Sequence, residues 1–277
     1  MLSSQIISIV TFIYLFSTVL YIGYLFFRNN TLGKVAFLTI LLGFIGNTAG
    51  IGLRWLESYQ MGVGHAPMSN LYESLVLFSW AIVLIYLVVE LKYRARVVGA
   101  FVSPFAFLTL AFLSLSPQVS DQIEPLIPAL QSNWLTSHVI TCFLGYAAFA
   151  VSCGVSIMYL VKLKKDGQGI TEFFPSLNIL DDLNYKAIAV GFVLLSIGII
   201  TGAAWADVAW GRYWGWDPKE TWSLITWFVY AAFIHARFTY GWRGKRAAIL
   251  SIVGFIAVLF TYLGVNLVLS GLHSYAN

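Results

Sequence analysis

Long apolar stretches separated by short polar segments dominate the pattern along the chain. A helix needs about 20 mainly apolar residues to cross the hydrocarbon core of a bilayer. Eight stretches approach or exceed that length: roughly 5–27, 35–53, 74–90, 97–115, 138–161, 187–204, 219–236 and 247–272. The pattern predicts an all-α, polytopic membrane helix bundle with about eight transmembrane helices. The first stretch lacks a basic n-region and a small-residue cleavage site, so we assign it to the bundle and not to a signal peptide.

The sixteen Lys and Arg residues are divided unequally between the two sides of this bundle. Thirteen fall in the short segments of one side, whereas the other side has only Arg54, Arg212 and Lys219. The positive-inside rule assigns the side with thirteen to the cytoplasm or its organellar equivalent. Both termini are then outside. The long outer segments are 54–73, 116–137 and 205–218, so we expect the chemistry at the outer face.

Composition narrows the class of protein further. Charged residues are 10% of the chain and apolar residues 59%, whereas a soluble domain has about 25% charged residues. An aromatic content of 17% excludes a disordered chain. The net charge of +4 reflects the basic residues gathered on the predicted cytoplasmic side. No basic patch is interleaved with stacking aromatic residues, so we expect no nucleic-acid partner.

The second outer segment, 116–137, has apolar residues at helical spacing. This spacing predicts a short helix lying in the membrane interface, with one face made of Ile123, Leu126, Ile127, Leu130 and Trp134. We expect no soluble domain, so residues 1–277 are predicted to form a single membrane-embedded domain.

Two cysteines lie on the fifth predicted helix. Cys142 and Cys153 are eleven residues apart, which separates them by about 16 Å along a regular helix. They cannot form a disulfide with each other. The sequence contains no CxxC or CxxCH pattern, so the chain is neither a dithiol oxidoreductase nor itself a c-type cytochrome.

The four histidines differ in predicted depth. His65 lies in the first long outer segment, His138 at the outer end of the fifth helix, and His273 at the outer end of the eighth. His235 lies in the seventh helix near its cytoplasmic end. A charged side chain deep in a bilayer costs about 2.5–3.5 kcal/mol on insertion scales. We therefore expect a neutral His235, whose imidazole would be a good ligand for iron.

The depth of His235 follows from the predicted start of its helix. The string Asp217-Pro218-Lys219-Glu220 has Asp at the N-cap, Pro at the first helical position and Glu at the third, which is a capping box. His235 is then seventeen residues into the helix, about 26 Å along its axis.

Tryptophan is concentrated in one part of the chain. Six of the ten tryptophans fall within 23 residues: Trp205, Trp210, Trp214, Trp216, Trp222 and Trp227. One or two tryptophans per helix end are enough to anchor a helix at the interface. Gly211 and Gly215 interrupt the run and would let the backbone approach a flat ligand closely.

With these residues the chain resembles cytochrome c assembly proteins of the CcsA/ResC type, which are System II members of the heme-handling family named for its tryptophan-rich WWD motif. The resemblance covers nearly the whole chain. It rests on the segments Gly64-His-Ala-Pro-Met-Ser-Asn-Leu-Tyr-Glu73, Pro128–Trp134 followed by His138, Trp210–Trp222, His235-Ala-Arg237 and Gly271-Leu-His-Ser-Tyr275.

The resemblance implies a set of heme-binding residues. His138 and His273 would ligate heme iron at the external face, and His235 would help to ligate a heme within the membrane. An external loop at about 205–222 would contact the porphyrin through Trp210, Trp214, Trp216, Asp217 and Trp222. We add Arg212 and Lys219, the only cations of that loop, as candidates to pair with heme propionates. No catalytic residue is assigned.

The resemblance also implies a function and partners. Such proteins bind heme b as substrate and ligand, and present it to the CxxCH cysteines of apocytochrome c. The chain would be the core subunit of a holocytochrome c synthase, a cytochrome c heme lyase-type complex, in a bacterial inner membrane or a thylakoid membrane. A CcsB/ResB-type membrane partner and thiol-reducing proteins would join it, in contact with membrane lipid. Because the other histidines are all on the outer side, we expect this partner to supply the second ligand opposite His235.

Simpler roles exist for several of these residues. Asp217 is expected to cap the seventh helix, and Asn70 the third. His65, two residues before Pro67, is expected to make local hydrogen bonds and not to ligate iron. His138 and His273 on their own could be ordinary interfacial histidines, and His235 alone could equally be part of a proton relay.

Two other functions compete with heme delivery. A b-type membrane electron carrier that oxidises quinol would pair histidines at two matched depths, and this chain has a matched pair at one depth only. A transporter with no redox role would show inverted repeats and broken helices near the midplane, and the sequence shows neither.

Overall fold

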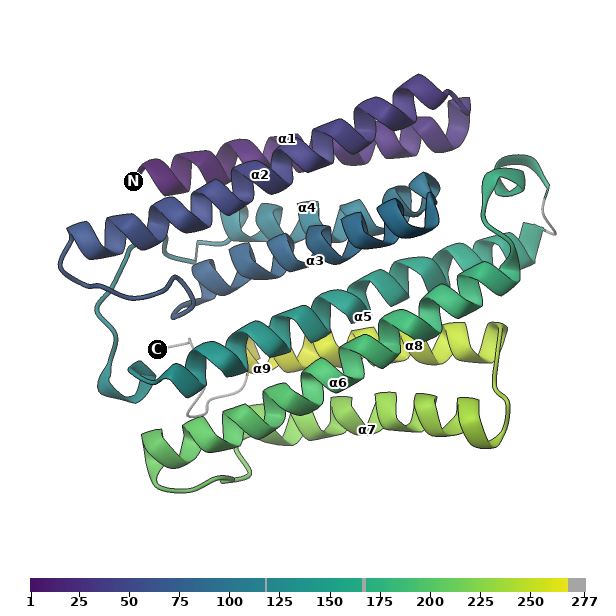
Figure 1. Cartoon of the computed structure of the whole chain (residues 1–277). Helices are drawn as coiled ribbons and strands as arrows, with labels where there is room; N and C mark the ends of the chain where they lie inside the picture. Colours follow the sequence, from purple (N-terminus) through teal and green to yellow (C-terminus); the bar gives the residue numbers. More distant parts are fainter. Residues whose placement is uncertain (118, 166–167, 269–277) are drawn as a thin grey trace. The chain divides into compact units, whose positions relative to one another are not determined.

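The computed structural model describes residues 1–117, 119–165 and 168–268 of the chain, and its regular elements there are all helical (Figure 1). The α-helices are α1 (Leu2–Phe27), α2 (Asn30–Gln60), α3 (Leu71–Tyr93), α4 (Gly99–Leu115), α5 (Asn133–Lys165), α6 (Leu177–Trp210), α7 (Pro218–Thr239), α8 (Lys245–Leu259) and α9 (Val265–Val268). The shorter turns are η1 (Arg96–Val98), η2 (Pro128–Leu130), η3 (Gly169–Phe173) and the π-helical turn η4 (Phe260–Gly264).

The membrane bundle expected from the hydropathy pattern is confirmed, and the chain is an integral membrane protein. Seven of the described helical segments are long and apolar enough to cross a bilayer. The predicted seventh span is also a helix, α7, of 22 residues, but it is not among those seven because its apolar character is weaker. Trp222, Trp227, His235 and Arg237 lower its hydropathy. A helix of this kind suits a bundle in which polar side chains face protein or a partner.

Many apolar side chains point outward from the helices. Only 22% of the most apolar part of α6 is buried, and Phe12 and Ile200 are each 69% exposed. In water such a surface would cause aggregation. In a bilayer it costs nothing, because lipid tails are as apolar as these side chains.

The helices extend beyond the predicted apolar cores. α2 continues to Gln60, and α6 continues to Trp210. The predicted loop at 205–222 is therefore corrected: residues 205–210 are helical, residues 218–222 open α7, and the connection itself covers only 211–217. Hydropathy marks the hydrocarbon region, whereas a helix ends where its backbone is capped.

The predicted interface helix in the second outer segment is wrong. Residues 119–127 have no regular structure, and only the short turn η2 follows before α5 begins at Asn133. Pro125 and Pro128 explain the difference, because each lacks an N–H and disfavours helical geometry in the residue before it. Ile123 is buried, but Ile127 is 61% exposed.

The described helices pack as two compact units. Unit 1 comprises Met1–Leu126 and Val161–Pro175. In it, α1 and α2 lie side by side along much of their length (Figure 1). A buried ion pair joins the last turns of α2 to the first turn of α3: Arg54 Nε lies 2.8 Å from Glu73 Oε1, and the two side chains are 3% and 1% exposed. Arg54 also donates to the backbone carbonyls of Asp121 and Gln122, so one guanidinium joins α2, α3 and the segment after α4.

Unit 2 comprises Ile127–Leu160 and Ser176–Asn277. Its helices α5 and α6 approach closely at glycines, since a Cβ on Gly145 would lie 3.1 Å from the Gly191 carbonyl oxygen. Small residues allow this kind of backbone contact between membrane helices. A hydroxyl pair, Thr226 with Thr261 at 2.8 Å, joins α7 to the turn η4. Unit 2 contains the predicted tryptophan-rich loop and every described candidate heme ligand.

Candidate functional site

The loop between α6 and α7 is flanked by two capped helix ends. Gly211 ends α6 in the left-handed conformation with φ 71°, and its N–H donates to the Asp207 carbonyl. Asp217 is the N-cap of α7 with Pro218 at the first position, and the predicted capping box with Glu220 is present. The prediction that Asp217 caps the seventh helix is confirmed.

Glu220 does more than complete the capping box. Its Oε2 accepts hydrogen bonds from the N–H of Gly215 at 2.7 Å and of Asp217 at 3.2 Å. The residue between them, Trp216, has φ 56° and is 69% exposed. A left-handed conformation costs a non-glycine residue roughly 1–2 kcal/mol. The two bonds to Glu220 offset this cost and display the Trp216 indole at the surface.

We expect Glu220→Ala to loosen this loop without unfolding the bundle. The substitution removes two bonds that span Trp216, each contributing about 1 kcal/mol. Hydrogen exchange at the amides of Gly215 and Asp217 should accelerate about fivefold or more, since 1.4 kcal/mol corresponds to a factor of ten. Glu124→Ala, at an exposed acid of the second outer segment, is the control and should leave residues 211–220 unchanged. Equal protection in both variants would contradict the role assigned to Glu220.

His138 lies on the first turns of α5 and packs against α6. Its Nδ1 is 2.7 Å from the Gly198 carbonyl oxygen. A carbonyl can only accept, so Nδ1 carries the proton, and the lone pair of the neutral ring is on Nε2. A Cβ on Gly202 would lie 2.5 Å from Nδ1, so only glycine there lets the ring come so close to α6.

Trp205 supports the His138 ring from α6. The two rings are stacked, with centroids 6.1 Å apart and planes 19° from parallel. Trp205 is itself 4% exposed and donates from Nε1 to the Ala129 carbonyl at 2.7 Å. Trp210, at the end of the same helix, meets the Trp205 ring edge to face at 4.8 Å. The structure thus brings His138 together with two of the six clustered tryptophans.

The other three tryptophans predicted to contact the porphyrin make separate ring contacts. Trp214 and Trp216 meet edge to face at 5.7 Å within the loop. Trp222, in the first turns of α7, packs on Phe260 at 4.2 Å. Phe260 begins the π-helical turn η4, a local geometry frequent at functional sites. This turn links the Trp222 position to the C-terminal helices of unit 2.

The two candidate partners for heme propionates, Arg212 in the loop and Lys219 at the start of α7, have different surroundings. Arg212 is exposed, and its guanidinium lies across Gly215, where a Cβ would come within 2.7 Å of it. Lys219 instead extends its ammonium toward the C-terminal helices and donates to Asn266 Oδ1 at 3.1 Å. Arg212 therefore presents its charge on the surface of the loop, whereas the structure places the Lys219 ammonium beside Asn266.

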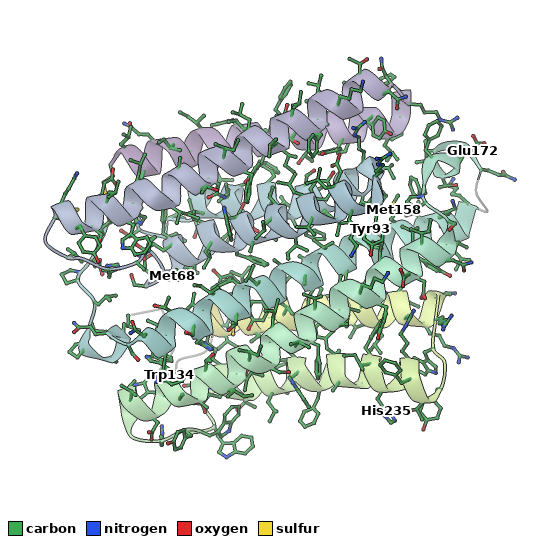
Figure 2. All side chains as sticks on the ribbon, in the orientation of Figure 1. Met68, Tyr93, Trp134, Met158, Glu172 and His235 are labelled. Carbon is green, nitrogen blue, oxygen red and sulfur yellow. The ribbon has the colours of Figure 1, made fainter. Side chains whose placement is uncertain are left out.

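His235 lies one turn before the end of α7, far from the tryptophan-rich loop (Figure 2). Its ring is exposed, with Nδ1 3.4 Å from Thr239 Oγ1 and the Tyr240 ring 5.9 Å away. His235 therefore lies about 26 Å along α7 from the first residue of that helix. His138, by contrast, lies beside the last turns of α6, which lead into the start of α7. The exposed His235 ring is accessible from outside this chain.

Of the other two histidines, only His65 lies among the described residues. His65 is 6% exposed, with Nδ1 2.9 Å from the Ala66 carbonyl and Nε2 3.0 Å from the Glu124 carbonyl. These contacts agree with the local hydrogen-bonding role expected for it. His273 lies outside the described residues. Within the described part of the chain no group of three or more His, Cys, Asp or Glu side chains could hold a bare metal ion. A porphyrin supplies four of the iron ligands itself, so heme needs only one or two from protein.

Three features of the site are absent from the sequence-based prediction. These are the stacking of Trp205 on His138, the glycine contact at Gly202, and the second role of Glu220. The spacing Gly198-x-x-x-Gly202 is a small-xxx-small pattern of close helix contacts, and it could have indicated which face of α6 meets α5. Neither stacking nor the loop bonds of Glu220 has a comparable pattern in the sequence.

The fold and the site together define a polytopic membrane protein with a tryptophan-rich, capped loop beside a histidine whose tautomer suits metal ligation. The sequence profile of the family described as Cytochrome C assembly protein matches residues 68–273. The chain belongs to this family.

Individual relatives agree with the family match. The chain is 41% identical over 275 residues to a cytochrome c biogenesis protein CcsA of Guillardia theta, covering 92% of this chain and 90% of that one. It is 43% identical over 271 residues to a cytochrome c biogenesis protein CcsA of Synechococcus elongatus, covering 81% and 82%. A solved structure of the cytochrome c heme lyase CcmF has a similar fold, with a TM-score of 0.71 and 17% identity over 94% of this chain and 46% of that chain.

Proposed function

We propose that this chain acts in c-type cytochrome biogenesis by binding heme b and presenting it for covalent attachment to the CxxCH cysteines of apocytochrome c. The chain would be the core subunit of a holocytochrome c synthase. Its tryptophan-rich loop would lie on the external side of a bacterial inner membrane or a thylakoid membrane. Membership of the cytochrome c assembly family supports a function in cytochrome c biogenesis. The site residues described above support heme binding as the chain's part in it.

The observation that carries the proposal is the orientation of His138. Histidines that ligate metals almost always donate their other ring N–H to a carbonyl or carboxylate, which determines the tautomer and the ring direction. His138 has this arrangement with the Gly198 carbonyl at 2.7 Å. The site therefore fits an iron ligand at Nε2. We propose His273 as the second external ligand.

The loop residues fit the other parts of a heme molecule. Trp210, Trp214, Trp216 and Trp222 present flat apolar rings, and Asp217 determines where α7 begins beside them. Arg212 would pair with a propionate, because a guanidinium binds carboxylates through two parallel hydrogen bonds. Lys219 already donates one hydrogen bond to Asn266, so we rank it after Arg212.

In this proposal the protein contributes mainly positioning. A heme vinyl group and a cysteine thiol must meet in a reactive geometry, and holding one of them rigidly replaces several kcal/mol of entropic barrier. Bis-histidine ligation would keep heme in place until the CxxCH histidine of the substrate displaces one ligand. Thiol-reducing proteins would keep the substrate cysteines reactive.

We propose a separate role for His235 in ligating a heme within the membrane, opposite a histidine of a CcsB/ResB-type partner. Its exposure at the end of α7 far from the loop supports a ligand completed from outside this chain. Purification of this chain alone should yield no bis-histidine heme at that depth, whereas co-expression with the partner should yield one. A six-coordinate inner heme in the chain purified alone would contradict the idea.

Absorption spectra of the reduced, purified protein test the proposal as a whole. The chain is expressed in heme-replete cells with and without the partner, together with an apocytochrome c reporter. We expect co-purifying b-type heme and covalently attached heme in the reporter. Bound heme without attachment would favour a b-type electron carrier. A colourless protein under both conditions would overturn the proposal.

Gly202→Ala tests the packing of His138 without changing any candidate ligand. The new methyl group would lie 2.5 Å from His138 Nδ1, so the ring must move and its bond to Gly198 must break. Loss of such a supporting bond lowers metal-site affinity about 10-fold to 100-fold, and we expect the heme content per protein to fall by at least the smaller factor. Gly52→Ala in α2, whose added Cβ would meet nothing within 4 Å, should leave heme content unchanged. Equal heme content in both variants would count against this site.

A further inference from the structure

A cavity of about 720 Å³ opens at the end of unit 2 that lies opposite the tryptophan-rich loop along α6 and α7. It is formed by the last turns of α5 and α7, the first turns of α6, and the connection between α7 and α8. The lining side chains that matter here are Tyr159, Asp181, Tyr185, Arg237, Phe238 and Arg243. The positive-inside rule assigns this end to the inner side of the membrane.

Arg237 is a nearly buried cation in the wall of this cavity. Its Nη2 donates to Asp181 Oδ2 at 2.9 Å, its guanidinium carbon is 4.4 Å from the centre of the Tyr185 ring, and its side chain is 11% exposed. Its Nη1 is buried and has no hydrogen-bond partner among the described residues. A buried donor without an acceptor costs about 1–3 kcal/mol, more when it is charged. The arrangement therefore points to an acceptor from a ligand.

The acids of the lining do not provide that acceptor. Asp181 uses Oδ2 for Arg237 and accepts the Gly244 N–H at Oδ1, 2.7 Å away. Asp182 pairs with Lys186 at 2.6 Å. Arg243 adds a second guanidinium to the lining from the α7–α8 connection. With both carboxylates engaged, the two arginines leave the cavity attractive to an anion.

Apolar groups beside these arginines indicate that the anion belongs to an amphipathic molecule. Phe238 is 72% exposed and meets the Tyr185 ring edge to face at 6.0 Å. Leu177, the first residue of α6, also lines the cavity. Basic pockets between membrane helices at the cytoplasmic surface bind anionic lipid headgroups. Apolar side chains at the rim would contact the acyl chains.

We propose that this cavity binds the phosphate-bearing headgroup of an anionic phospholipid of the inner leaflet, with Arg237 and Arg243 as its donors. The site is distinct from the proposed inner heme ligand. His235 precedes Arg237 by two residues, which places the two side chains about 200° apart around α7. A lipid bound here would tie the ends of α5, α6 and α7 to the α7–α8 connection.

Native mass spectrometry of the full chain tests the proposal, with phosphatidylglycerol and phosphatidylcholine as probes. We expect phosphatidylglycerol to be retained preferentially, and Arg243→Gln to lower its retention about fivefold, since one arginine near a membrane surface contributes about 1 kcal/mol of attraction. Arg246→Gln is the matched control: it removes an equally exposed arginine three residues further along, one that does not line the cavity. This variant should retain the lipid as the unchanged protein does.

The role of Arg237 is tested with a double substitution, because Arg237→Gln alone would leave the Asp181 carboxylate without its cation. Arg237→Gln combined with Asp181→Asn removes both charges together and should also lower phosphatidylglycerol retention. Equal retention by Arg243→Gln and Arg246→Gln, or no preference for the anionic lipid, would overturn the proposal. Inorganic phosphate displacing no lipid would support a lipid-specific site. Loss of added hemin from Arg243→Gln with lipid retention unchanged would show that the arginines serve heme carboxylates and would also overturn it.

Discussion

His138→Ala should abolish heme attachment to an apocytochrome c reporter while leaving the helix bundle intact. The substitution removes the Nε2 lone pair that the Gly198 hydrogen bond orients, and with it the proposed external iron ligand. Removing only a supporting partner of a metal ligand costs about 10-fold to 100-fold, so we expect loss of the ligand itself to exceed about 100-fold. Covalent heme in the reporter, measured after denaturing electrophoresis, is the readout.

Two controls separate ligation from folding in this experiment. Exogenous imidazole should restore part of the attachment in His138→Ala, because it can occupy the space of the lost ring, and it should do nothing for a misfolded protein. Trp134→Ala removes a half-exposed aromatic residue one turn earlier on α5 (Figure 2) and should retain most of the activity. Full attachment in His138→Ala without imidazole would exclude His138 as a required ligand.

Arg54→Ala should cause a large loss of stability in unit 1. It leaves the Glu73 carboxylate, 1% exposed, without its cation and releases the carbonyls of Asp121 and Gln122. Breaking one partner of a buried ion pair costs about 3–5 kcal/mol. We expect a marked fall in the thermal unfolding midpoint in detergent, together with faster proteolysis of the segment after α4.

The exposed pair of the same unit provides the control for this prediction. Arg28 and Glu172 lie 3.2 Å apart with side chains 36% and 56% exposed. Exposed pairs contribute about 0–1 kcal/mol, so Arg28→Ala should barely shift the midpoint. Replacing Arg54 and Glu73 together by leucine should recover much of the loss, because no charge is then left buried. Equal shifts for Arg54→Ala and Arg28→Ala would refute the assigned importance of the buried pair.

Local features of the site were predictable from the sequence. The capping box at Asp217 depends on residues three positions apart, and the structure has it as predicted. The end of α6 was not, because helix ends depend on caps and hydropathy reports only apolar character. The outer segment after α4 misled the prediction, since apolar spacing favoured a helix where Pro125 and Pro128 oppose one.

The sequence by itself determined that this is an all-α membrane protein of the cytochrome c assembly type, where its apolar membrane-spanning stretches lie, and where α7 begins. Those properties follow from hydropathy, local capping and motifs that are continuous along the chain. Only the tertiary structure decided which nitrogen of His138 bears the proton, that Trp205 supports its ring, and that Lys219 contacts Asn266. Each of these depends on the register between neighbouring helices. That register is set by close packing at residues such as Gly198 and Gly202, and no single segment of the sequence encodes it.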